Sequence, residues 1–362
     1  MNIVVVTWAG GKNYGTYLQA YALCTKLRKI GHKVSLLTGI SINRSLIGYI
    51  RGIVRPLWMR ITCKDETLLK MLSFKRKYMN EKKIVFPFQI TKLVNSTDVF
   101  VTGSDQIWNT YHEYNPTMFL DFVKDKKRIA YASSIGTNDV KEDYKEGVKQ
   151  HLLKFKHIGV REEVAAKALS KLTGRKDIMQ VLDPTFLLTP MDWFDMSRNT
   201  EIKIKIPQKY ILCYFVGENS WYSDQLAVVK EKTNIENIVI VPLKENSIFT
   251  HGNAIIYKHA DPAEFIHLLR NASLICTDSF HASALSINNS KNFVEFMRFK
   301  DDDQKSQNSR IYDLLDHYNL TDRIYNVDNM SWADDIDYNE VQNTLETDRK
   351  RSLDYLVNAI EN

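Results

Sequence analysis

The sequence has few cysteines and lacks both a long apolar run and a dinucleotide fingerprint. Its four cysteines lie far apart and form no CxxC pair or Cys/His cluster, so a structural zinc site and a redox pair are not expected. No apolar run approaches the length of about 18 residues that a membrane span requires, and the first residues lack the features of a secretion signal. We therefore expect a protein of the reducing cytoplasm that is neither exported nor embedded in a membrane.

Apolar sequence is plentiful enough for more than one core. The chain contains 362 residues, of which 44% are hydrophobic and 25% are charged. This composition is typical of a globular protein, and the length slightly favours two domains over one.

Positive charge is concentrated in one segment, residues 44–83. The segment holds eleven Lys/Arg and three Asp/Glu, although the net charge of the whole chain is only +6. Apolar residues between Leu46 and Ile61 follow helical spacing, with arginines between them. We favour a helix that packs on its own domain; the alternative is an amphipathic helix in peripheral contact with the inner face of an anionic membrane. Nucleic-acid binding is not expected, because no motif for it accompanies the charge.

Strands alternate with helices along the chain, which favours doubly wound parallel sheets. The pattern starts with a strand, a glycine-containing turn, a helix and a second strand between residues 3 and 38. We predict an N-terminal Rossmann-like domain over 1–200, a polar linker at 196–208, a C-terminal Rossmann-like domain over 201–335, and a helix over 336–362 that packs back across both. Two such domains would face each other across a cleft at the carboxyl ends of their strands, where ligands bind.

The first candidate site follows the first strand, at residues 13–20 (NYGTYLQA). Glycine at this turn lets the backbone approach a ligand, and the start of a helix exposes unpaired N–H groups. The spacing is not GxGxxG, so a dinucleotide site is not supported. Taken alone, the segment is more typical of a tight turn with a capped helix. Its candidate binding residues are Asn13, Tyr14 and Gln19.

The second candidate site is GSDQIWN, residues 103–109, which directly follows an apolar run. Its side chains suit a sugar, because amides bond hydroxyl groups and the Trp108 ring can stack on a pyranose face. Asp105 is a candidate general base. The structural alternative is an Asx-type cap with a buried tryptophan, but for the cluster as a whole we favour a functional role. The further candidates for ligand contact are Ser104, Gln106 and Asn109.

The third candidate site is TDSFHASA, residues 277–284, where a strand ends and a helix starts. A histidine beside hydroxyl groups at a helix start can combine an acid/base with an anion site, although a lone histidine is more often structural. Ser279 and His281 are the candidates. Guanidinium groups commonly bind carboxylates and phosphates, although each basic residue by itself is typical of a solvated surface. Four basic residues lie in suitable loops or at a helix start: Arg161, Arg298, Lys305 and Arg310.

Six motifs are spread over nearly the whole chain: NYGTYLQAYAL (13–23), GSDQIWN (103–109), VREE (160–163), LDPTFLL (182–188), TDSFHASALSI (277–287) and NSRIYDLL (308–315). Together they resemble the polysaccharide pyruvyltransferase family, and GSDQIWN is the most distinctive of them. The resemblance implies a glycosyltransferase-B-like fold, phosphoenolpyruvate as donor, no required metal or cofactor, and a pyruvate ketal on a sugar as product. The implied acceptors are cell-surface glycans of bacteria or their lipid-linked precursors.

The resemblance also implies roles for individual residues. Arg161 matches an arginine implicated in donor binding, and His281 matches a histidine thought to act in acid/base chemistry. Many members have Arg-x-His where this chain has Ser279-Phe280-His281, so one expected guanidinium is missing; Arg298 or Arg310 is the candidate substitute. The acceptor is expected on the N-terminal domain, with Asp105 as its base, and the donor on the C-terminal domain.

Two other functions remain open at this point. A glycosyltransferase that uses a nucleotide sugar has the same frame of two Rossmann-like domains, and a fold does not fix a function. A glycan-assembly protein without catalytic activity is the second alternative, and the missing arginine is the only sign of it. Donor choice separates the first alternative from pyruvyl transfer, and measurable turnover would exclude the second.

Overall fold

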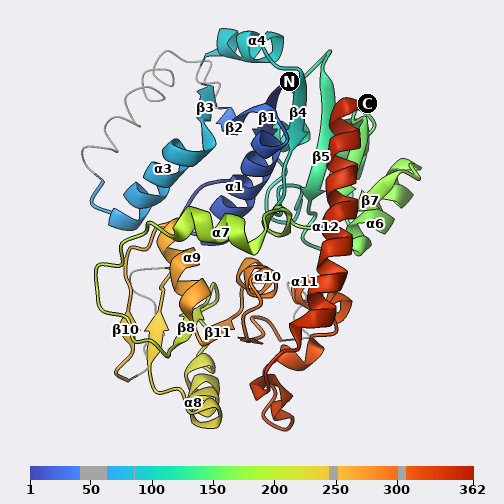
Figure 1. Cartoon of the computed structure of the whole chain (residues 1–362). Coiled ribbons are helices and arrows are strands. Elements are labelled where there is room, and N and C mark those ends of the chain that lie inside the picture. The colour runs from blue at the N-terminus through green and yellow to red at the C-terminus, as the bar shows by residue number, and fades with distance from the viewer. Residues whose placement is uncertain (41–62, 85, 244–251, 301–306) are drawn as a thin grey trace. The chain divides into compact units, whose positions relative to one another are not determined.

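The computed structural model describes residues 1–40, 63–84, 86–243, 252–300 and 307–362 (Figure 1). These residues form two compact units. Unit 1 comprises Met1–Gly11, Thr16–Leu187 and Asp348–Asn362, and unit 2 comprises Lys12–Gly15 and Leu188–Thr347. The predicted amphipathic helix near 46–61 lies outside the described residues. Within the described ranges, no helix has the length and apolar character needed to cross a bilayer.

Unit 1 is built on a parallel sheet of seven strands in the order β3-β2-β1-β4-β5-β6-β7. Every neighbouring pair in this sheet is parallel, so each connection must cross over a face of the sheet. The strands are β1 (Asn2–Val6), β2 (Lys33–Ile40), β3 (Glu81–Ile84), β4 (Val99–Thr102), β5 (Lys127–Ser133), β6 (His157–Val160) and β7 (Ile178–Gln180).

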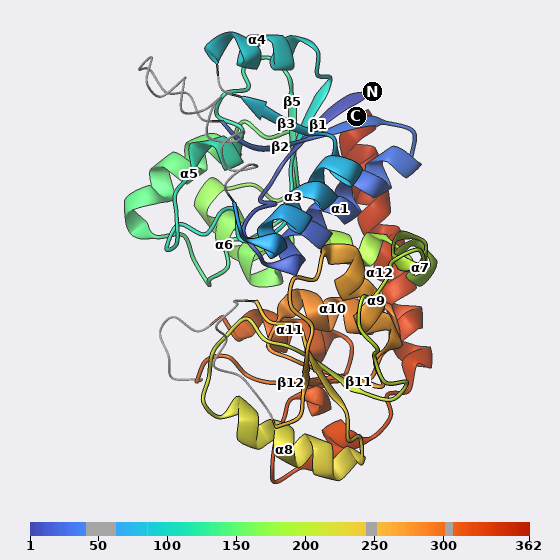
Figure 2. The ribbon, with the colours of Figure 1, turned by 90° about the vertical axis from the view of Figure 1, so that its left-hand side faces the viewer.

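Helices cover both faces of this sheet, as right-handed crossovers require. Figure 2 shows α1 and the C-terminal part of α12 on one side, and α5 and α6 on the other. The helical segments that belong wholly or partly to unit 1 are α1 (Tyr14–Lys29), α3 (Glu66–Met79), α4 (Pro87–Asn95), α5 (Lys145–Leu152), α6 (Glu163–Thr173), α12 (Tyr338–Glu361) and the short 3-10 turns η1 (Pro116–Phe119), η2 (Glu142–Tyr144) and η3 (Pro184–Leu187).

Unit 2 repeats the design with five parallel strands in the order β10-β9-β8-β11-β12. Helix α8 lies on one face of the sheet, and α9 and α10 lie on the other (Figure 2). The strands are β8 (Ile211–Tyr214), β9 (Ile238–Ile240), β10 (Ile255–Ile256), β11 (Leu274–Thr277) and β12 (Phe293–Glu295). The helical segments are α7 (Pro190–Ser197), α8 (Tyr222–Thr233), α9 (Pro262–Asn271), α10 (Phe280–Asn288), α11 (Ser309–His317), η4 (Thr321–Arg323) and η5 (Met330–Ala333).

The prediction of two Rossmann-like α/β domains is confirmed by these two sheets. In each sheet the strand order reverses once, between β1 and β4 in unit 1 and between β8 and β11 in unit 2. Strands β4, β8 and β11 are buried along their whole length, because helices cover both faces. In sheets of this kind, the loops that follow the strands at the reversal point are the ones that bind ligands. All three candidate sites lie in those loops.

Candidate active site

The first motif, NYGTYLQA, is divided between the two units. Tyr14 belongs to unit 2, where its ring stacks on Phe265 with the centroids 4.7 Å apart. Its hydroxyl donates to the Ala260 carbonyl at 3.2 Å, and its side chain is buried. Burial raises the pKa of Tyr14 well above its usual range. Tyr14 is therefore a core residue of unit 2, and its expected contact with an acceptor does not fit the structure.

Asn13 and Gly15 belong to unit 2 and contact other segments of it. The Asn13 Oδ1 atom accepts from the Gly15 N–H at 2.9 Å and from the Tyr214 hydroxyl at 3.3 Å. A Cβ atom at position 15 would overlap the His281 imidazole. Only glycine permits this close approach, so the turn predicted from the sequence brings the first motif against the third.

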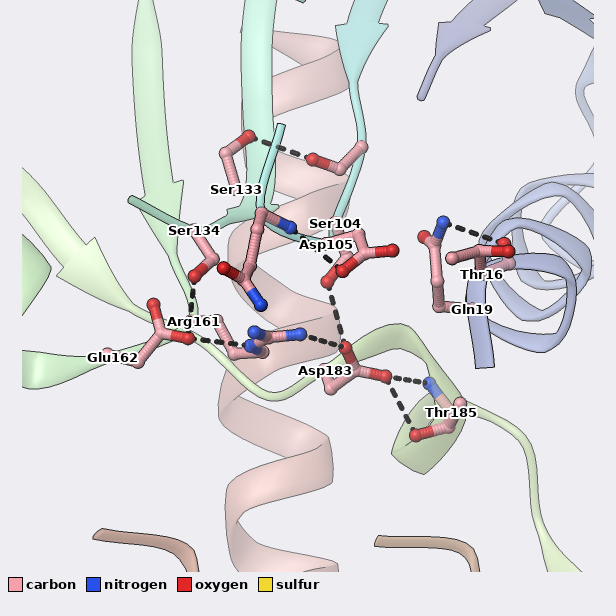
Figure 3. A network of polar contacts seen from close by, with 12 residues as sticks. Thr16, Gln19, Ser104, Asp105, Ser133, Ser134, Arg161, Glu162, Asp183 and Thr185 are labelled. Carbon is pink, nitrogen blue, oxygen red and sulfur yellow. Dashed lines mark hydrogen bonds and ion pairs between the residues drawn. The ribbon is translucent and has the colours of Figure 1, made fainter. Parts of the chain in front are cut away.

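Gln19 lies further along α1, in unit 1, and it is fully buried. Its Nε2 atom donates to the Trp8 carbonyl at 2.9 Å and to the Thr16 carbonyl at 3.0 Å, and lies 3.3 Å from Thr7 Oγ1. Figure 3 shows Gln19 and Thr16 at one side of a larger polar network. Gln19 therefore fixes the loop after β1, beside the loop that carries GSDQIWN.

Ser104 and Arg161 meet at Asp183, which lies after β7. The Asp183 Oδ2 atom accepts from Ser104 Oγ at 2.8 Å and from Arg161 Nη1 at 3.3 Å (Figure 3). The Asp183 Oδ1 atom accepts from both the N–H and the hydroxyl of Thr185, at 3.0 and 2.8 Å. The Arg161 Nε atom donates to Glu162 Oε1 at 2.8 Å, and this oxygen also accepts from Ser134 Oγ at 2.8 Å. We call these six residues the unit 1 cluster.

The environment of Arg161 argues against the expected contact with the donor. Its side chain is only 2% exposed and forms ion pairs with Glu162 and Asp183. Burial lowers the pKa of the guanidinium, but the charges of Glu162, Asp183 and Asp105 outweigh this effect and hold the pKa above its usual range. With three carboxylates around one guanidinium, the site has an excess of negative charge, which does not suit an anionic donor. Arg161 instead positions two carboxylates.

Asp105 lies at the edge of this cluster in a left-handed backbone conformation, with φ of 76°. Such a conformation costs a non-glycine residue on the order of 1 kcal/mol, and aspartate tolerates it better than most residues. Its carbonyl accepts from the Ser134 N–H at 3.1 Å, while its Oδ1 atom accepts from the Gln106 N–H at 2.9 Å. Both contacts hold Asp105 at the carboxyl end of the sheet.

The other side chains of GSDQIWN lie in different surroundings. The Asn109 amide donates to Gln106 Oε1 at 2.8 Å, and both side chains lie against Gly136, where a Cβ atom would overlap them. The Trp108 ring is 1% exposed and stacks on Phe119 at 5.2 Å, with an interplanar angle of 4°. The expected stacking of Trp108 on a sugar is therefore wrong, because the indole belongs to the core.

In unit 2, the Asp278 carboxylate fastens the loops after β8, β11 and β12 together. Its Oδ1 atom accepts from the Val216 N–H at 2.6 Å, and its Oδ2 atom accepts from the Gly217 N–H at 2.7 Å. The Tyr222 hydroxyl and Arg298 Nε also donate to Oδ2, at 2.8 and 3.0 Å. The side chain of Asp278 is not exposed at all.

This arrangement holds Arg298 at the start of α10. Its Nη2 atom donates to the Asp278 carbonyl at 2.7 Å, directly before Ser279, and 23% of its side chain stays exposed. Arg310 approaches the same helix start from α11, with its guanidinium carbon 5.9 Å from the centre of the Phe280 ring. Both candidate guanidinium groups therefore lie near Ser279 and His281. Lys305 lies outside the described residues.

A family model described as polysaccharide pyruvyl transferase matches residues 13–300 of the chain. The chain belongs to the polysaccharide pyruvyl transferase family. The match includes all three candidate loops and confirms the resemblance inferred from the motifs. Membership implies a transferase activity with a polysaccharide as the acceptor.

Solved structures resemble this polysaccharide pyruvyl transferase family member in fold. UDP-GlcNAc 2-epimerase from Neisseria meningitidis bound to UDP-GlcNAc has a TM-score of 0.54 at 10% identity, over 99% of this chain and 100% of that chain. A putative UDP-N-acetylglucosamine 2-epimerase from Listeria monocytogenes has a TM-score of 0.52 at 10% identity, over 99% and 96%. At this identity the likeness shows the fold alone, which is of the glycosyltransferase-B class. A sequence comparison with curated proteins gave no match.

Four acidic residues in or near these loops were not among the site residues predicted from the sequence. Asp183 and Asp278 each lie inside a motif, shortly after a strand, so their position was a usable signal. Glu162 follows Arg161 and could not be distinguished from a helix-capping acid. Glu295 is a single acid within the apolar run Phe293 to Phe296, and this pattern indicates a buried carboxyl group.

Proposed function

We propose that this protein transfers the pyruvyl group of phosphoenolpyruvate to two hydroxyl groups of a sugar in a cell-surface polysaccharide or its lipid-linked precursor, forming a cyclic ketal. The observation that carries this proposal is the start of α10, where a histidine and two guanidinium groups lie together in a member of this family. The family supplies the class of reaction, and this site supplies groups that suit the donor.

The donor is assigned to unit 2. Phosphoenolpyruvate carries a carboxylate and a phosphate, and guanidinium groups bind both through paired hydrogen bonds. Arg298 takes the role of the arginine that the family often has at position 279, because it reaches the same helix start from the loop after β12. Arg310 and the first N–H groups of α10 add positive potential at this point.

The acceptor is assigned to unit 1, where a negative cluster suits neutral hydroxyl groups. Asp105 accepts a proton from the attacking hydroxyl, while Gln106 and Asn109 orient the sugar through their amides. Gln106 is half-buried and Asn109 lies beside it, so we expect their contribution to be positioning of the sugar. Ser104 and Gln19 act indirectly, because Asp183 and the loop after β1 already engage them.

In the proposed reaction, the two sugar hydroxyl groups release two protons, and both are accounted for. His281 delivers a proton to the methylene carbon of phosphoenolpyruvate, which leaves an oxocarbenium-like centre at C2. One sugar hydroxyl attacks this centre, and the second hydroxyl attacks the same carbon as the C–O bond to phosphate breaks. Of the two hydroxyl protons, one replaces the proton that His281 gave and the other leaves with phosphate.

The first test is thermal stabilisation of the pure protein by phosphoenolpyruvate, compared with UDP-sugars and GDP-sugars. A ligand that binds the native state raises its melting temperature, so an effect of phosphoenolpyruvate alone is expected. Stabilisation by a nucleotide sugar alone would replace this proposal with a nucleotide-sugar glycosyltransferase. Ketal formation on an extracted glycan then establishes turnover and excludes a protein without catalytic activity.

Membrane contact through residues 44–83 is a second part of the proposal, since a lipid-linked acceptor would be presented at the inner face of the membrane. Not every basic residue of this segment can contact a membrane. Lys75 is buried, pairs with Glu81 at 2.8 Å and donates to the Ala9 carbonyl at 2.9 Å. Replacing the other basic residues of the segment by glutamine should release the protein from anionic liposomes. Unchanged liposome binding would contradict the membrane contact.

A further inference from the structure

A second carboxyl group lies behind the start of α10. Glu295 ends strand β12 and is only 1% exposed, and its Oε2 atom is hydrogen-bonded to the Ser283 hydroxyl. Ser283 lies in α10, four residues after Ser279. Glu295 is therefore linked to the same helix that carries the proposed proton donor, although it belongs to a different element.

The hydrogen-bond geometry of Ser283 favours a proton on Glu295. The Ser283 Oγ atom lies 3.2 Å from the Ser279 carbonyl, which already accepts from the Ser283 N–H at 3.0 Å. A serine hydroxyl has one proton to donate, and a carbonyl has none. Both contacts of Ser283 Oγ are satisfied together only when Glu295 donates to Ser283 and Ser283 donates to the Ser279 carbonyl.

The charges around Glu295 favour the same protonation state. Arg298 is already paired with Asp278, with Nε and Oδ2 3.0 Å apart. Arg323, in the η4 turn packed against β12, is engaged by Asp322 and by the carbonyls of Ser331 and Asp334. Burial raises the pKa of Glu295 to about 8, even when Ser283 is taken to donate to the carboxylate, which lowers the pKa; Asp278 adds to the rise and Arg298 acts against it. An ionised Glu295 would leave two carboxylates beside the single guanidinium of Arg298.

We propose, on the basis of the function assigned above, that protonated Glu295 is a positioning residue of the donor site: through Ser283 it holds the start of α10, and its ionisation weakens binding of phosphoenolpyruvate. Two effects act in the same direction. Loss of the proton breaks the chain of hydrogen bonds to the Ser279 carbonyl. The new negative charge also repels a donor that is itself an anion.

The test measures the dissociation constant of phosphoenolpyruvate from about pH 6 to about pH 9.5, for the full chain and for Glu295→Gln. In the wild type, affinity should fall about tenfold for each pH unit above the ionisation of Glu295. The glutamine amide can donate to Ser283 and does not ionise, so the variant should match the wild type at low pH and keep its affinity at high pH. Ser283→Ala should bind weakly at every pH.

The outcomes separate this inference from the proposed function. If the wild type and Glu295→Gln lose affinity in parallel as the pH rises, another group is responsible and the role of Glu295 is overturned while the donor assignment stands. A wild-type affinity that is flat over this range overturns it too. If the wild type binds no phosphoenolpyruvate at any pH, the proposed function fails, and the donor-site role of Glu295 fails with it.

Discussion

The carboxyl edges of the two sheets are similar in topology and opposite in charge. In unit 1, Arg161 lies among Asp105, Glu162 and Asp183, so carboxylates outnumber the guanidinium. In unit 2, Asp278 is matched by Arg298, with Arg310 near the same helix start. The same loops of a Rossmann-like sheet can thus suit a neutral polyol or an anion, depending on which charges the loops carry.

Replacing His281 by alanine should reduce turnover by a factor of about 100 to 10,000, the usual contribution of a general acid. The fold should survive, because the deletion removes one side chain at the first turn of α10. Turnover and melting temperature are the two measurements. His317→Ala, in the exposed last turn of α11, is the matched control and should behave as the wild type. Near-normal turnover of His281→Ala would exclude this residue from the chemistry.

Replacing Arg298 by glutamine should weaken phosphoenolpyruvate binding about ten- to hundredfold, because the donor loses a charged partner. Isothermal titration provides the dissociation constant. The comparison variant is Arg310→Gln, which should lose less, because Arg298 donates to the Asp278 carbonyl directly before Ser279, whereas the Arg310 guanidinium lies 5.9 Å from the centre of the Phe280 ring. A larger loss in Arg310→Gln would assign the substitute guanidinium to α11.

Replacing Arg161 by alanine should lower the free energy of unfolding by about 3–5 kcal/mol, because two buried carboxylates lose their partner. Arg198→Ala is the control: its side chain is 55% exposed in its pair with Asp195, and the expected cost is below about 1 kcal/mol. Urea denaturation measures both variants. An Arg161→Ala protein that is as stable as the wild type but no longer binds phosphoenolpyruvate would return Arg161 to the donor site.

Glu295→Gln should change how stability depends on pH. The folded-state pKa of about 8 lies above the usual 4.5, so the wild type loses stability as the pH rises between these values. Between about pH 6 and about pH 8 the loss should reach about 2–3 kcal/mol, at 1.36 kcal/mol per pKa unit. The glutamine variant should lack this decline in denaturation curves recorded without ligand. A decline of equal size in both proteins would show that Glu295 is ionised throughout.

Tyr14→Phe should have the smallest effect, because it removes only the hydrogen bond to Ala260 and keeps the stacked ring. The expected cost is about 1 kcal/mol of folding stability, with unchanged saturation by the glycan acceptor. A change in the apparent affinity for the acceptor, without a change in stability, would place Tyr14 in the acceptor site after all.

Local sequence patterns predicted the elements that carry strong periodicity and clear boundaries. Helix α9 begins at Pro262, directly after Asp261, which caps the helix by accepting from the Glu264 N–H at 2.8 Å; a cap followed by a proline marks a helix start in the sequence alone. The two-residue strand β10 and the three-residue strand β12 were not predicted, since so few residues show no period. Their pairing partners, not their own sequences, make them strands.

The family, the two doubly wound sheets and the loops in which the candidate residues lie could all be predicted from the amino-acid sequence. These features depend on motifs and on apolar periodicity, which are local properties of the chain. The surroundings of Tyr14, Trp108, Arg161 and Glu295 became visible only in the tertiary structure. Each depends on which groups from distant segments surround the side chain, because burial and neighbouring charge, not residue type alone, decide whether a ring is core and whether a carboxyl group keeps its proton.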